Sequence, residues 1–355
     1  MKRGVIVFGI YAILAGIILA VWARATLTEI VEKGPDGEPH YTWANLSKMI
    51  DGTAPTPFVR RRLLPDSAAF LARAIPQPIW DSLKDYLEGE SCCARKLRGV
   101  LDRLGWQPEH YPQLFSGYFL IGLSILGFMY ASRQLARFFY DMPAGMADAV
   151  GGLFGICLLG GNDGRWNGYT YDIPNAFLFA MCIYAIVARR WWLLPAFILA
   201  SYSKETAMLL IIGYALVNRA SYRRLSFWLV LAAMAALYFS IRTWIGQHYD
   251  TPPGDYYWYP RRNLVFLVKE GIYNLWWVFV AGVICVRIFL IRREVPRDLL
   301  WLLVMGLVVL GAAFFKGWIE ERRQYLEMLP IVGLIVLQWA SLELGIGHLF
   351  RPKNT

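Results

Sequence analysis

The feature that most constrains this chain is a series of long apolar runs separated by short basic clusters. Most of these runs hold about 17–22 residues, and an apolar helix of about 20 residues crosses the roughly 30 Å hydrocarbon layer of a bilayer. Hydrophobic residues make up 57% of the 355 residues, and 15 residues are Trp. We therefore predict an all-α, polytopic membrane helical bundle. Residues 1–355 form a single transmembrane domain in this prediction, with no soluble domain.

The apolar runs predict about ten spans. They are residues 4–23, 113–132, 145–161, 174–188, 191–202, 206–218, 226–245, 271–291, 299–315 and 325–344. The first run is longer than the core of a typical signal peptide, and no small-residue cleavage site follows it. We interpret it as a retained span.

Basic residues in alternate loops set the orientation of these spans. The loops hold Lys2 and Arg3; Arg133 and Arg137; Arg189 and Arg190; Arg219, Arg223 and Arg224; Arg292, Arg293 and Arg297; and Arg351 and Lys353. The positive-inside rule places all six clusters, and both chain ends, on the cytoplasmic side. The net charge of +10 follows from these clusters, so it does not indicate a nucleic-acid partner.

The same orientation places a long first loop, residues 24–112, on the external side. Residues 57–80 of this loop mix apolar and charged side chains at helical spacing and contain Pro65, Pro76 and Pro78. A lipid-exposed crossing does not tolerate that composition. We expect one or two helices that lie in the membrane interface.

The stretch "SYSKET" (201–206) joins two apolar runs that are too short for a full crossing. The two short helices would place Lys204 and Glu205 below the outer surface, in a cavity. An ionisable residue at membrane depth indicates function by default, and Lys204 can bind a phosphate as a point charge. The alternative is a Lys–Glu pair that ends two spans. Adjacent helical residues do not face each other, so we expect Lys204→Met to fold and to bind phosphate more weakly.

Three consecutive arginines, Arg60, Arg61 and Arg62, lie on the side where positive charge is normally avoided. Arginine binds phosphate oxygens in a bidentate fashion. Consecutive positions on a helix point in different directions, so at most two of the three reach one ligand. Anchoring to anionic lipid head groups is the alternative.

A second charged cluster lies in "WIEERRQYLEML" (318–329), between two apolar runs. Its members are Glu320, Glu321, Arg322 and Arg323. These charges either neutralise one another where a helix begins, or complete an external anion site in which the glutamates hold the arginines.

Asp172 comes just before an apolar run, with Pro174 at the helix entry. Aspartate is common at helix starts, where it caps the helix and interacts with its dipole. The preceding Gly-rich loop also holds Asp163, Trp166 and Tyr171, and aromatic residues around a carboxylate are typical of sugar sites. We expect Asp172, Lys204 and the two arginine clusters to converge on one external cavity.

The plan of loops and spans resembles the GT-C class of integral-membrane glycosyltransferases over most of the chain, to about residue 330. The resemblance rests on "PFVRRRLLP" (57–65), "YTYDIPNAFLF" (169–179), "SYSKET" (201–206) and "EERRQYLEMLP" (320–330). Such enzymes have a cytoplasmic amino terminus and a long first external loop with interfacial helices. The resemblance implies a protein of the bacterial inner membrane whose active site faces the non-cytoplasmic side.

The resemblance also implies the chemistry. The donor is a polyprenyl-phosphate-linked sugar, a carboxylate deprotonates the acceptor hydroxyl, and cations stabilise the departing phosphate. Members of the class usually carry a catalytic Asp in the first external loop, where this chain offers Glu29, Asp36, Glu38 and Asp51. Asp172 is a further candidate base.

The cofactor predictions are limited to a divalent metal, which Asp163 and Asp172 could ligate. Some members of the class use a metal and others do not. The sequence holds no Walker A motif and no Gly-rich dinucleotide fingerprint, so no nucleotide is expected. It also has no Cys or His cluster with zinc spacing.

Three other functions remain open. A transporter or flippase for lipid-linked saccharides would favour charges spread through the spans and duplicated halves, whereas these charges gather on one face. A polysaccharide polymerase or ligase usually has a large late external loop, whereas the longest loop here is the first. A non-catalytic subunit of a membrane complex would keep activity after its external charges are neutralised.

Overall fold

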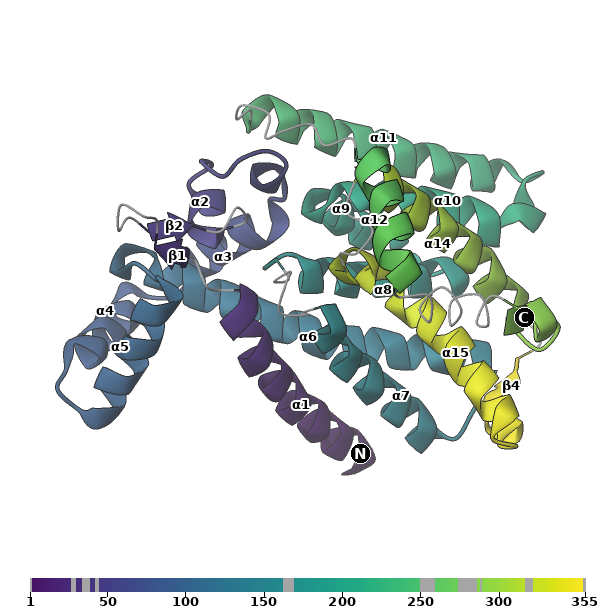
Figure 1. Cartoon of the computed structure of the whole chain (residues 1–355), viewed down its shortest axis with the longest axis horizontal. Coiled ribbons are helices and arrows are strands. Elements are labelled where there is room, and N and C mark those ends of the chain that lie inside the picture. Colours follow the sequence, from purple (N-terminus) through teal and green to yellow (C-terminus); the bar gives the residue numbers. More distant parts are fainter. Residues whose placement is uncertain are drawn as a thin grey trace.

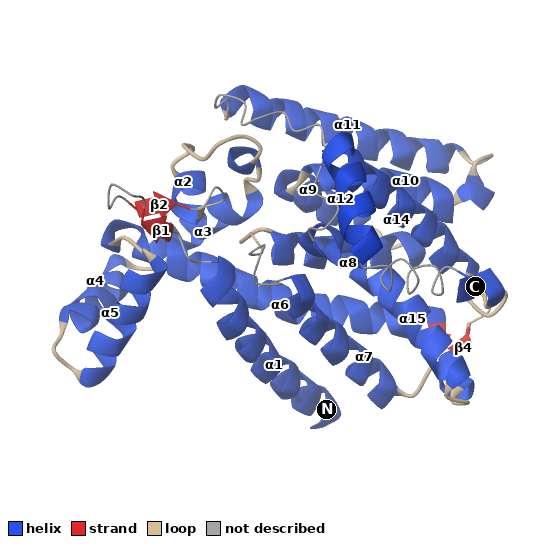
Figure 2. Cartoon of the chain, in the orientation of Figure 1, coloured by secondary structure: helices blue, strands red, loops and turns tan. Residues whose placement is uncertain are grey.

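The computed structural model describes residues 2–26, 30–33, 39–41, 45–161, 169–249, 259–273, 286–287, 289–316 and 322–353. In these ranges the chain is almost entirely helical (Figure 2). Two short antiparallel pairs are the described strands: β1 (Ile30–Lys33) with β2 (Pro39–Tyr41), and β3 (Tyr140–Asp141) with β4 (Arg351–Pro352). The prediction of an all-α protein is confirmed for the described residues.

Five of the described helices are long and apolar enough to cross a membrane. They are α1 (Lys2–Thr26), α6 (Tyr111–Phe139), α11 (Leu225–His248), α14 (Arg297–Lys316) and α15 (Leu329–Glu343), which the 3-10 helix η6 (Arg322–Met328) precedes. Four shorter apolar helices accompany them: α7 (Ala144–Cys157), α8 (Asp172–Val187), α9 (Leu193–Ser203) and α10 (Met208–Val217). The expected span at 271–291 lies largely outside the described residues, so the number ten stays a prediction.

Helix α8 forms the centre of the bundle. Almost all of its residues are buried, as expected for a helix that is apolar on every side. It packs against α6, α9, α10 and η6 (Figure 1). The largest fully buried side chains include Trp22 of α1 and Phe128 of α6. Helix α8 therefore begins, at Asp172, inside the protein rather than in an open loop.

Several contacts bring the basic clusters to one end of the bundle. Arg3 pairs with Asp148 of α7 at 2.8 Å, and Arg133 of α6 pairs with the same carboxylate. Arg219 lies 4.0 Å from Asp298. Strands β3 and β4 pair at this end too, beside the carboxyl end of α6. The side of a membrane on which these clusters lie stays a prediction.

The described part of the first loop forms four helices, α2 (Leu46–Ile50), α3 (Leu63–Ala74), α4 (Gln77–Glu88) and α5 (Cys92–Leu104). Helix α3 packs against α6 and buries Leu64, Ala68 and Ala72. Helices α4 and α5 pack against each other and project away from the bundle (Figure 1). Residues 57–80 are thus helical and contain none of the candidate spans. Their position in the membrane interface stays a prediction.

Two native cysteines provide a test of sidedness. Cys92 and Cys93 are exposed at the start of α5, whereas Cys182 is buried. We expect a membrane-impermeant maleimide added to intact spheroplasts to label the wild-type protein. The double variant Cys92→Ser/Cys93→Ser should lose that label, which separates it from labelling at the other cysteines. Labelling that needs permeabilised cells would place α5 on the cytoplasmic side.

Gly151 provides a test of the packing between α1, α6 and α7. A Cβ atom at Gly151 would lie 2.7 Å from the backbone oxygen of Met129 and would also clash with the hydroxyl of Tyr11. The backbone of α6 cannot move aside as a flexible side chain can. Gly151→Ala should therefore lower the free energy of unfolding by about 1–3 kcal/mol. Gly16→Ala is the matched control, because nothing lies within 4 Å of its Cβ. Equal melting temperatures of the two purified variants would contradict this packing.

Candidate functional site

The site begins at a break between two short helices. Helix α9 ends at Ser203, the 3-10 helix η4 (Glu205–Ala207) follows, and α10 starts at Met208. Lys204 between them has an extended backbone, with φ −156° and ψ 153°. Helices α9 and α10 contain 11 and 10 residues, and a rise of about 1.5 Å per residue makes each roughly half as long as the hydrocarbon layer is thick. The break therefore places Lys204 at depth in the bundle.

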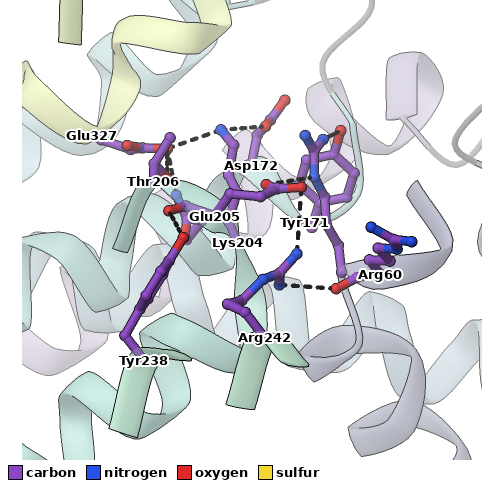
Figure 3. A network of polar contacts seen from close by, with 11 residues as sticks. Arg60, Tyr171, Asp172, Lys204, Glu205, Thr206, Tyr238, Arg242 and Glu327 are labelled. Carbon is purple, nitrogen blue, oxygen red and sulfur yellow. Dashed lines mark hydrogen bonds and ion pairs between the residues drawn. The ribbon is translucent and has the colours of Figure 1, made fainter. Parts of the chain in front are cut away.

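Lys204 is buried in a network with two carboxylates (Figure 3). Its Nζ lies 2.8 Å from Oε1 of Glu327 and 3.6 Å from Oδ1 of Asp172. Glu327 Oε1 also accepts hydrogen bonds from Oγ1 of Thr206 at 2.9 Å and from Nδ2 of Asn175 at 2.5 Å. Segments that lie more than 120 residues apart in the sequence are joined here by one oxygen atom.

Lys204 forms its ion pairs with carboxylates distant in the sequence rather than with the adjacent Glu205. The backbone at Lys204 is extended rather than helical, and the Glu205 side chain faces Arg61 and Arg242. Lys204 has Glu327 and Asp172 as carboxylate partners. Its charge is compensated before any ligand arrives, so its role in phosphate binding stays a prediction.

Asp172 combines a structural role with its ion pair. It is 3% exposed, and its Oδ2 accepts a hydrogen bond from the backbone N–H of Tyr169 at 2.9 Å. This bond closes the turn that leads into α8, and Oδ1 faces Lys204. The helix-start interpretation of Asp172 is thus supported, and its role as a catalytic base stays a prediction.

A second group of charges surrounds Glu205. Nε of Arg61 lies 3.3 Å from Oε2 of Glu205, and Nη2 of Arg242 lies 3.6 Å from Oε1. Arg242, on α11, also donates a hydrogen bond to the backbone oxygen of Arg60 at 3.1 Å. The hydroxyl of Tyr238 donates to the backbone oxygen of Glu205 at 3.0 Å. The loop before α3 and helix α11 are thereby joined at one carboxylate.

Tyr171 connects the two groups of charges. The guanidinium of Arg61 lies 4.4 Å from the centroid of its ring and donates a hydrogen bond to its hydroxyl. Nζ of Lys204 lies 6.0 Å from the same centroid. Cations are attracted to the face of an aromatic ring at such distances. The whole arrangement holds three cations, Lys204, Arg61 and Arg242, and three carboxylates.

The three consecutive arginines separate, as expected from their positions. Arg61 reaches Glu205, whereas the Arg60 guanidinium is turned away from Lys204 (Figure 3). Arg62 is buried, pairs with Asp66 and donates a hydrogen bond to the backbone oxygen of Met49. Arg62 therefore fastens the loop to α2 and α3 and does not join the charges around Lys204.

Several predicted residues cannot be placed. Glu29, Asp36, Glu38, Asp163 and Glu320 lie outside the described residues, as do the side chains of Arg322 and Arg323. The backbone of η6 packs against α8, so this charged stretch does approach the site. The described residues contain no group of three or more His, Cys, Asp or Glu that could hold a metal ion.

Two important residues were missed by the sequence analysis, Glu327 and Arg242. Glu327 lies between Leu326 and Met328 at the start of an apolar run, and Arg242 lies inside one. Both are ionisable residues at membrane depth, which is the signal that could have identified them.

Comparisons with known proteins found no match for this chain among family models, curated proteins or solved structures. In the part of the chain that the structure describes, the fold and the site define an all-α protein with five helices long and apolar enough to cross a membrane, and with a charge network at the break between α9 and α10.

Lys204→Met tests the buried network. The change leaves Glu327 and Asp172 buried without their cation, and breaking a buried ion pair on one side costs about 3–5 kcal/mol of stability. The double variant Lys204→Met/Glu327→Gln should be more stable than Lys204→Met alone, because one uncompensated charge is removed. Thermal unfolding of the wild type, of Lys204→Met, of Glu327→Gln and of the double variant gives the coupling energy.

Lys84→Met is the matched control for this experiment. Lys84 and Glu88 are both 65% exposed and 3.9 Å apart, so the control should lose less than about 1 kcal/mol. A Lys204→Met protein as stable as the wild type would show that the network is not needed for folding.

Proposed function

We propose that this chain is an integral-membrane glycosyltransferase. It moves a sugar from a polyprenyl-phosphate donor to an acceptor hydroxyl on the non-cytoplasmic face. The observation that carries this proposal is the convergence of Arg61 and Arg242 on one carboxylate above a buried charge network. The resemblance of the chain to GT-C enzymes in its loop plan and short motifs supports it.

The chemistry of such a transfer fits these groups. The bond from the anomeric carbon to the phosphate oxygen breaks, and negative charge gathers on the departing phosphate. Preorganised cations stabilise such developing charge most effectively where water is excluded. Arg61 and Arg242 have side chains that are 13% and 14% exposed, and they supply this stabilisation. The donor arrives through the bilayer, so no nucleotide site is required.

A base must also take the proton of the acceptor hydroxyl. The carboxylates of Asp172 and of the first external loop, Glu29 and Glu38, are the candidates for this role. Asp172 faces Lys204 at 3.6 Å, which keeps its charge compensated when the site is empty. Glu205 lies on the phosphate side of the site in this proposal, and Glu320, Arg322 and Arg323 stay candidates for phosphate binding.

One observation favours a second candidate, a transporter or flippase for lipid-linked saccharides. The second oxygen of Glu327, Oε2, is buried and has no hydrogen-bond partner in the described part of the chain. Buried ionisable groups of this kind occur in proton relays of transporters. One simple experiment distinguishes the two functions: a glycosyltransferase makes product in detergent, whereas a transporter needs a sealed membrane.

The test is sugar transfer by purified protein in detergent from a radiolabelled polyprenyl-phosphate sugar. Arg61→Ala and Arg242→Ala should each lower the rate by about 10²–10³-fold, the usual loss for one group that stabilises developing charge. Arg287→Ala is the matched control, because Arg287 is half exposed and pairs with Glu343. Transfer at the wild-type rate by both site variants would contradict the proposed function.

A further inference from the structure

We propose that Glu205 is a built-in competitor for a phosphate oxyanion: its carboxylate occupies the position between Arg61 and Arg242 that the phosphate takes. Binding then exchanges one anion for another on the same two guanidiniums. The identity of the phosphate as that of a lipid-linked donor rests on the proposed function, whereas the exchange itself does not.

The first argument is the geometry of the two arginines. They come from segments 181 positions apart in the chain, and each faces a different oxygen of Glu205. Two guanidiniums around one oxyanion are the usual arrangement for binding a phosphate. The distances of 3.3 and 3.6 Å exceed the roughly 2.7–2.9 Å of a strong charge-assisted hydrogen bond. Glu205 is therefore held loosely, mainly by charge.

The second argument is exposure. The Glu205 side chain is 36% exposed, whereas those of Glu327 and Asp172 are 1% and 2% exposed. Among these three carboxylates, Glu205 alone has an open side. A ligand reaches the two arginines past Glu205, and the displaced carboxylate has space to turn away.

The third argument is that the surroundings stay in place when the Glu205 side chain moves. The backbone oxygen of Glu205 is held by Tyr238. Arg61 is held by Tyr171, and Arg242 by the backbone oxygen of Arg60. Lys204 keeps both of its own carboxylate partners. The side chain of Glu205 can thus leave while Arg61 and Arg242 keep their positions, and the incoming ligand replaces the negative charge that the two cations lose.

Competition of this kind has a measurable consequence. A ligand that binds only when Glu205 has withdrawn loses affinity in proportion to the fraction of molecules in the withdrawn state. A phosphate monoester carries up to two negative charges and displaces a carboxylate with one. The phosphodiester of the donor carries only one negative charge and gains less from the same two arginines, so the exchange is most favourable for the prenyl phosphate that transfer releases.

Glu205→Gln is the decisive variant, because the amide keeps the shape of the side chain and removes its charge. We expect it to bind both inorganic phosphate and a short prenyl phosphate about tenfold more tightly than the wild type, as measured by titration calorimetry in detergent. Prenyl alcohol should bind equally to both proteins. Glu205→Asp keeps the charge but shortens the reach, so its affinity should fall between the two, and it serves where the amide variant does not fold.

Glu343→Gln is the matched control. Glu343 also pairs with an arginine at 3.3 Å, but it lies at the far end of α15 from η6 and is 47% exposed. This variant should leave phosphate affinity unchanged. Weaker or equal phosphate binding by Glu205→Gln would overturn the competitor role, since Glu205 would then position the arginines or leave them unaffected.

The two probes separate this inference from the proposed function. Tighter inorganic phosphate binding by Glu205→Gln, without sugar transfer by the wild type, would uphold the exchange and reject the glycosyltransferase. Sugar transfer by the wild type, with equal prenyl phosphate affinity in both proteins, would uphold the glycosyltransferase and reject the exchange.

Discussion

The contact between Lys204 and Glu327 is the interaction on which the site depends. It joins the break between α9 and α10 to the 3-10 helix η6, and both contact the start of α8. Charges buried at this depth are stable only when paired and hydrogen-bonded. The pair therefore requires α8, α9 and η6 to meet in one register, and the more exposed charges around Glu205 depend on that arrangement.

The charges of the site form two layers, one buried around Lys204 and one open to solvent around Glu205. The inner charges of Lys204, Asp172 and Glu327 are enclosed and mutually compensated, which suits a scaffold. The outer charges of Arg61, Arg242 and Glu205 are held at longer distances and reach solvent through Glu205. A binding site for a charged ligand needs both a rigid inner support and an outer group that the ligand can replace.

The sequence allowed the helical class and most of the apolar helices to be predicted, because the period of apolar residues is a local signal. It also identified Asp172, Lys204 and Arg61. It could not give the pairing, because the partner of Lys204 is set by how distant helices pack. Glu327 lies within the stretch 318–329, but four consecutive charges at residues 320–323 form a stronger signal in the sequence than one glutamate between apolar residues. Arg62 was predicted to bind a ligand, although its i, i+4 spacing from Asp66 already indicated a local ion pair; its hydrogen bond to the backbone oxygen of Met49 is the tertiary contact that spacing does not reveal.

The ion pair between Arg3 and Asp148 has a consequence for how the chain is made. In the predicted orientation, Arg3 is part of the charge that orients the first helix as it enters the membrane, whereas its partner emerges from the ribosome 145 residues later. The same guanidinium would then act twice in time, first as a topological signal and then as an internal contact. Once α7 is in place, Asp148 ties the start of α1 to the rest of the bundle.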